Sequence, residues 1–146
     1  MRSKNISLLF GIIGLLILII SSSILEEVVY NFKDTYYVTN AISFGFSVLA
    51  LYIIYALIYF VISKNSIYIL GILNLIFVTL FIFNLMFTEA IFEIIPPNKY
   101  HENPILLDIT HYVPVGMFVL FLIGNLFLLV NIIKSSFIYI KYKAST

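Results

Sequence analysis

Four long apolar segments constrain this chain more than any other feature of its sequence. They cover residues 6–25, 40–63, 67–88 and 112–133, and no Asp, Glu, Lys, Arg or His interrupts any of them. A helix of about 20 residues is enough to cross the hydrocarbon core of a bilayer. Membrane-spanning strands would have to alternate in polarity, and these segments do not. The sequence therefore predicts four transmembrane helices.

The composition supports lipid as the main solvent of the chain. Hydrophobic residues make up 62% of the 146 residues and charged residues 10%, whereas a soluble domain has roughly 45–50% and about 25%. A soluble fold of this size cannot bury so much apolar surface. We therefore expect an all-α fold: one domain over residues 1–146, a polytopic membrane protein with a four-transmembrane-helix bundle.

Acidic and basic residues separate between the two sides of the predicted bundle. Loop 26–39 carries three acids against one lysine, and loop 89–111 carries four against one. The remaining flanks are purely basic, with Arg2, Lys4, Lys64, Lys134, Lys141 and Lys143. The positive-inside rule then predicts an N-in/C-in topology, two short acidic extracytoplasmic loops and a basic cytoplasmic tail, residues 134–146. We expect the plasma or inner membrane of a prokaryote.

The first segment admits a second interpretation. Arg2 and Lys4, an apolar run and then Ser21, Ser22 and Ser23 are also compatible with a signal peptide cleaved after Ser23. The apolar run continues to Leu25 without a helix breaker, which favours a retained membrane anchor. In both cases loop 26–39 is external.

The polar run PPNKYHENPILLDITHY, residues 96–112, contains both histidines. Pro96 and Pro97 should end the third helix, and Asn103 followed by Pro104 is typical of a helix start. We expect a short amphipathic piece there, and a fourth span with Pro114 in its first turn. One hypothesis is an outer-surface metal site formed by His101, Glu102, Asp108 and His111. No HExxH or other recognised spacing is present, so ordinary external-loop polarity is the favoured alternative.

Polar side chains within the predicted spans are uncharged. Ion-coupled carriers and proton pumps usually require an ionisable group inside the bilayer, and none occurs in these segments. Asn74 and Asn125 lie at matching depth, where they are positioned to bond to each other. Together with Ser43, Ser47 and Asn84 they are interpreted as helix-packing polar residues rather than a substrate pathway. The glycines are expected to allow close helix approach: Gly11, Gly14, Gly45, Gly71, Gly116 and Gly124.

Tyr52, Tyr55 and Tyr59 recur at spacings of three and four, on one side of the second span. Bonds to neighbouring backbone or an interfacial position are expected for them more than a ligand cavity.

Three function classes follow from these observations. The favoured one is a small integral membrane protein without catalytic machinery or cofactor: an accessory, assembly or immunity-type subunit that acts through helix packing or outer-loop contacts. Its partners would be the lipid bilayer and another membrane protein or itself; a net charge of +1 and no basic stripe argue against nucleic acid. The alternatives are a homo-oligomeric pore or carrier, with Ser43, Ser47, Asn74 and Asn125 lining the path, and a membrane enzyme using the outer metal site.

Overall fold

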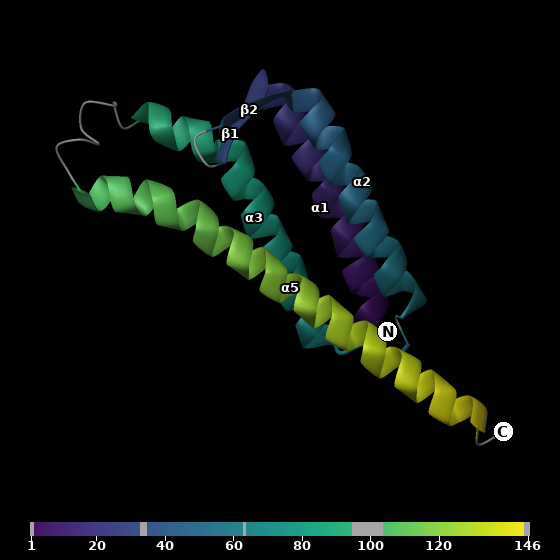
Figure 1. Cartoon of the computed structure of the whole chain (residues 1–146). Coiled ribbons are helices and arrows are strands. Elements are labelled where there is room, and N and C mark those ends of the chain that lie inside the picture. The colour runs from purple at the N-terminus through teal and green to yellow at the C-terminus, as the bar shows by residue number, and fades with distance from the viewer. Residues whose placement is uncertain (1, 33–34, 63, 95–103, 145–146) are drawn as a thin grey trace.

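Four long helices and one β-hairpin make up the described part of the protein (Figure 1). The computed structural model describes residues 2–32, 35–62, 64–94 and 104–144. In chain order the elements are α1 (Arg2–Ile24), β1 (Glu27–Phe32), β2 (Thr35–Asn40), α2 (Ala41–Val61), α3 (Tyr68–Ile94) and α5 (Pro104–Ala144). Each helix contains a stretch long and apolar enough to cross a membrane. The prediction of four helices, each long and apolar enough to span a membrane, is therefore confirmed.

The helices pack in two pairs. α1 runs along α2, and α3 runs along α5, which crosses the other helices obliquely (Figure 1). α1 also contacts α3, so the two pairs share one core. The N- and C-termini lie at one end of the molecule, and the β-hairpin lies at the other (Figure 1).

The closest packing partners are not the helices joined by the shortest connection. Residues between α2 and α3 form a tight turn, in which the amides of Asn65 and Ser66 both donate to the carbonyl of Ile62 at 3.1 Å. The sequence therefore favours α2 and α3 as a close antiparallel hairpin. In the structure α1 lies closest to α2, and α3 lies closest to α5. Tyr52 of α2 reaches Thr79 of α3 through its side-chain hydroxyl.

The third and fourth helices are longer than their predicted spans. α3 continues beyond residue 88 to Ile94, shortly before Pro96 and Pro97, and α5 begins at Pro104 as the Asn-Pro pair predicts. The prediction of a short amphipathic helix separate from the fourth span is wrong, because α5 is continuous over 41 residues. Pro114 lies in the interior of α5 and not in the first turn of a span. Proline removes one backbone donor, and transmembrane helices tolerate this loss when neighbouring groups satisfy the freed carbonyl. Residues 134–144, expected as a tail, also belong to this helix.

The segment between the first two helices, predicted to be an outer loop, forms regular structure. β1 and β2 pair antiparallel, from Glu27 opposite Asn40 to Phe32 opposite Thr35. Two residues, 33 and 34, separate the closing pair, and the flanking Val, Tyr and Thr residues favour strands. At the end of β2 the side chain of Asn40 accepts hydrogen bonds from the amides of Ile42 and Ser43, at 2.9 and 3.4 Å. It thereby caps α2, so the strand passes directly into the helix.

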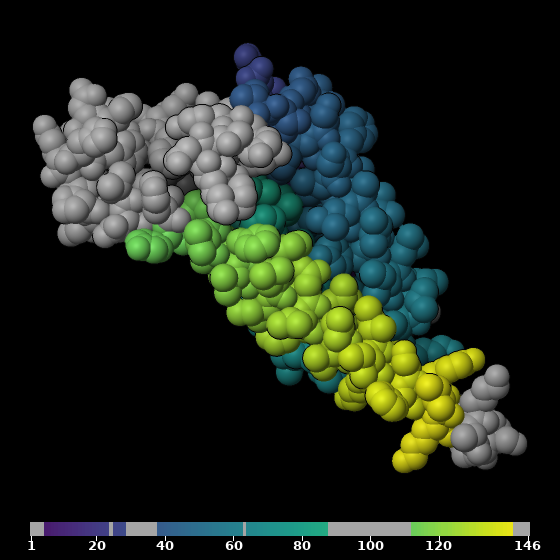
Figure 2. All heavy atoms as spheres, viewed as in Figure 1, coloured from purple at the N-terminus to yellow at the C-terminus, as the bar shows by residue number. Residues whose placement is uncertain are grey.

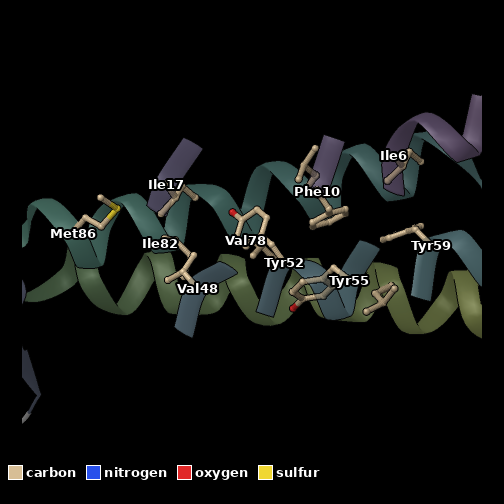
Figure 3. Packing of buried hydrophobic residues seen from close by; sticks show 12 residues of the cluster. Ile6, Phe10, Ile17, Val48, Tyr52, Tyr55, Tyr59, Val78, Ile82 and Met86 are labelled. Carbon is tan, nitrogen blue, oxygen red and sulfur yellow. The ribbon is translucent and has the colours of Figure 1, made fainter. Parts of the chain in front are cut away.

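The core lies where α1, α2 and α3 face one another (Figure 3). Toward the hairpin end it is aliphatic, and toward the end that holds the termini it is aromatic. Its labelled members are Ile6, Phe10 and Ile17 from α1, Val48, Tyr52, Tyr55 and Tyr59 from α2, and Val78, Ile82 and Met86 from α3. The position of Phe10 within this cluster makes α1 an integral part of the fold.

Candidate functional site

Three tyrosines of α2 form the centre of the buried polar region. Tyr52, Tyr55 and Tyr59 are 0%, 4% and 0% exposed, so they point into the bundle and not toward the membrane interface. The ring of Phe10 stacks on Tyr55 at a centroid distance of 5.1 Å and on Tyr59 at 5.4 Å, and tilts against Tyr52 at 5.7 Å. One α1 side chain therefore orders all three rings, and their hydroxyls are directed at α3 and α5.

Tyr52 links α2 to α3. Its hydroxyl lies 2.8 Å from Oγ1 of Thr79, and Thr79 itself donates to the carbonyl of Leu75 at 2.7 Å. A threonine hydroxyl has only one proton. Since that proton is directed at Leu75, the Tyr52 hydroxyl is the donor in the bond between the helices.

Tyr55 links α2 to α5. Its hydroxyl donates to Oδ1 of Asn125 at 2.5 Å, and Nδ2 of Asn125 donates to the carbonyl of Phe121 at 2.8 Å. Both polar atoms of the Asn125 amide are thus bonded, and the orientation of its side chain is fixed. In Figure 3 the Tyr55 ring projects toward the ribbon of α5.

Two asparagines join α3 and α5. Nδ2 of Asn74 donates to the carbonyl of Gly124 at 2.8 Å. Asn131 brackets Ile67, the residue just before α3: its Oδ1 accepts from the Ile67 amide at 2.7 Å, and its Nδ2 donates to the Ile67 carbonyl at 3.3 Å. One backbone donor at the start of α3, the Ile67 amide, is therefore satisfied by a side chain of another helix.

The Asn74–Gly124 and Asn131–Ile67 contacts are separated by the same number of residues on both chain segments. Asn74 follows Ile67 by seven residues, and Asn131 follows Gly124 by seven. A seven-residue repeat keeps one face of each helix against the other over two turns. The polar groups thus fix the register of the antiparallel α3–α5 pair.

The expected bond between Asn74 and Asn125 does not form, because each amide bonds to other groups. The remaining three polar candidates have different environments. Ser43 and Ser47 are exposed on the outer side of α2, where Ser47 donates to the Ser43 carbonyl at 2.9 Å. Asn84 is half-buried on α3 and takes part in an interaction.

Three buried polar atoms have no hydrogen-bond partner among the described residues: the Tyr59 hydroxyl, Oγ of Ser66 and Oδ1 of Asn74. The Tyr59 hydroxyl lies near the side chain of Asn131 but outside hydrogen-bond geometry. A buried group without a partner costs free energy. These atoms are therefore the weakest points of an otherwise satisfied network.

Glycines divide into two groups. Added Cβ atoms would meet neighbours at Gly14, Gly45, Gly71 and Gly124, but not at Gly11 or Gly116. At Gly14 the nearest atom is Cβ of Tyr52, at 2.7 Å, and at Gly45 it is Oγ of Ser21. Four of the six glycines therefore allow close helix approach within the chain, as expected.

The proposed metal ligands lie mostly beyond what the structure describes. His101 and Glu102 fall outside the described residues. Asp108 and His111 belong to α5, three positions apart, and their side chains are outside the described part. Within the described ranges no group of three His, Asp or Glu side chains is placed to hold a metal ion.

Sequence reasoning missed Asn131 and Thr79, which bond between helices. A signal for Asn131 was present in its seven-residue spacing from Gly124. Thr79 carries no such signal, because threonine is common in apolar helices and its partner lies 27 residues away.

Comparison of the chain with known protein families, with curated proteins and with solved structures finds no match.

Proposed function

We propose that this protein is a non-catalytic membrane subunit that acts by packing against another membrane protein. The supporting observation is how its polar side chains are used. Tyr52, Tyr55, Asn125 and Asn131 bond one helix of the chain to another. These groups build the bundle, so they are not available as a catalytic centre or as the lining of a path through one copy.

The outer face of α2 supplies a surface for the partner. Ser43, Ser47 and Ala50 are all exposed and follow one another at intervals of four and three, so they share one side of the helix. Their neighbours on the exterior are large and apolar, such as Phe46 and Ile54. Between membrane helices there is little hydrophobic driving force, and small residues mark the places where a second helix approaches closely.

The orientation and location belong to the same proposal. Exposed Lys64, Lys134 and Lys141 lie toward the end that holds both termini, whereas exposed Glu26 and Glu27 lie beside the hairpin. Under the positive-inside rule this separation supports cytoplasmic termini and an external hairpin. We infer the plasma or inner membrane of a prokaryote as the location.

Two matched serine substitutions test the docking surface. Ser47 and Ser136 are both exposed, and each donates to the carbonyl four residues earlier at 2.9 Å. Ser47→Leu should remove a co-purifying partner while leaving the chain folded, because a bulky side chain prevents close helix approach. Ser136→Leu makes the same chemical change on α5 and should leave the partner bound. Equal recovery of the partner with both variants would contradict the proposal.

A homo-oligomeric pore or carrier is the second candidate. It is favoured by the outward position of Ser43 and Ser47, which lets these hydroxyls line a path between copies. This candidate predicts that the protein co-purifies only with itself, and that reconstituted vesicles conduct a polar solute or ion. The metal-dependent enzyme remains a prediction of its own, and a metal count on the purified protein tests it.

A further inference from the structure

The C-terminal part of α5 extends beyond the helix against which it packs. The amide of Asn131 is bonded to the backbone of Ile67, immediately before the start of α3. From residue 132 onward α5 therefore continues past the end of α3 (Figure 1), and its surface projects from the bundle in the space-filling view (Figure 2). Ten residues, 132–141, add about 15 Å of helix.

This projecting segment is apolar and exposed. Phe137, Tyr139 and Ile140 are 69%, 65% and 63% exposed. Three neighbouring large side chains on one short segment are unfavourable in water. The segment should therefore lie in the bilayer or at its surface, with the tyrosine suited to the interface.

The length of α5 places the end of this segment among the headgroups. The apolar stretch Tyr112–Lys141 comprises 30 residues, which is about 45 Å of helix. A bilayer is about 30 Å thick in its hydrocarbon core and about 40–45 Å with its headgroups. When Tyr112 lies at one surface, Lys141 reaches the headgroup layer of the other.

Three exposed lysines lie near this end of α5. Lys134 and Lys141 are exposed and seven residues apart, so they share one side of α5 over two turns. Lys64 is also exposed and lies three residues before Ile67, just as Lys134 lies three residues after Asn131. The hydrogen bonds between Asn131 and Ile67 therefore place Lys64 and Lys134 at a similar depth in the membrane. The exposed acids Glu26 and Glu27 are at the opposite end, beside the hairpin.

We propose that Lys64, Lys134 and Lys141 form a binding surface for anionic phospholipid headgroups, beside the embedded apolar segment 137–140. Lysine stems pack along apolar surface while their ammonium groups reach outward, and these groups donate strong hydrogen bonds to phosphate oxygens. Anionic lipids attract basic residues near the membrane surface. This surface is separate from the face of α2 assigned to a protein partner, so it stands without the proposed function.

The test measures lipid binding to the purified full-length protein in a neutral detergent. Phosphatidylglycerol and phosphatidylcholine with the same acyl chains are titrated, and bound lipids are counted by native mass spectrometry. The wild-type protein should bind the anionic lipid more tightly than the zwitterionic one. Removing a lysine should weaken that binding roughly fivefold, so Lys134→Gln with Lys141→Gln should weaken it by more than tenfold.

The control removes two lysines that do not belong to the proposed surface. Lys33→Gln with Lys99→Gln changes the net charge equally, at positions between β1 and β2 and between α3 and α5. This variant should keep the affinity of the wild type. Equal binding of the two lipids by the wild type, or equal loss in both double variants, would overturn the proposal. Equal binding of the two lipids by the wild type overturns the proposal even if one variant fails to fold.

Discussion

Removing one hydroxyl at a time from α2 tests whether the buried tyrosines hold the helices together. The hydroxyls of Tyr55 and Tyr59 lie one turn apart on the same helix, and both rings stack on Phe10. They differ in their polar contacts. Tyr55 donates to Asn125, whereas the buried Tyr59 hydroxyl has no hydrogen-bond partner among the described residues. Replacing each with phenylalanine keeps the ring and removes only the oxygen.

The two substitutions should differ in their effect on stability. A hydrogen bond between membrane helices contributes about 0.6–2 kcal/mol, so Tyr55→Phe should lower the free energy of unfolding by about that amount. It also leaves Oδ1 of Asn125 without its donor, which places the expected loss in the upper part of the range. Tyr59→Phe removes a buried group that makes no bond. That variant should therefore be as stable as the wild type or more stable.

Reversible unfolding in mixed detergent micelles measures this difference. Both variants should retain the helix content of the wild type, and the Tyr55→Phe transition should move to a lower denaturant concentration. A double-mutant cycle of Tyr55→Phe with Asn125→Leu should show a coupling of about 0.6–2 kcal/mol. The reasoning is refuted if Tyr59→Phe destabilises the protein as much as Tyr55→Phe does.

Three further substitutions, with Gly11→Ala as a control, test the packing and the helix starts by the same unfolding assay. Gly14→Ala should lower the free energy of unfolding by about 1–3 kcal/mol, because the new methyl group meets Tyr52 of α2. Gly11→Ala has open space around it and should not change the stability. Equal effects of the two substitutions would contradict the close approach of α1 and α2. Asn131→Leu should lower the free energy of unfolding by about 1–3 kcal/mol, because the Ile67 amide loses its hydrogen-bond acceptor. Unchanged stability would show that the Asn131–Ile67 contact is unimportant. Asn40→Ala should lower the free energy of unfolding by about 0.5–2 kcal/mol through loss of the N-terminal cap of α2. Unchanged stability would mean that the hairpin alone positions α2.

Much of the architecture is predictable from the sequence, because lipid imposes a simple requirement on the backbone. Spans without charges had to be helices, and Pro104 marked the start of α5. Pro114 was harder to interpret, since proline interrupts a soluble helix but is tolerated within a membrane helix. The hairpin was not predicted, because a segment with charges at 26, 27, 33 and 34 and several tyrosines also fits a polar loop with interfacial aromatic residues.

The polar network was less predictable, because its partners come from distant parts of the chain. Matching depth predicted a bond between Asn74 and Asn125, but Asn74 bonds to Gly124 and Asn125 bonds to Tyr55. Depth alone does not fix rotation about the helix axis, so the partner of Asn125 proved to be Tyr55, 70 residues away. Ser43 and Ser47 illustrate the same limit, since a helix that is apolar on all sides gives no signal of which face is outside.

The composition of the native complex tests the central claim most directly. Tagged protein purified from its own membranes in a mild detergent can be sized by mass, with every co-purifying chain identified and bound metals counted. The account predicts a stoichiometric second membrane protein and no stoichiometric metal. A chain that purifies alone, or one that carries one metal ion per molecule, would contradict it.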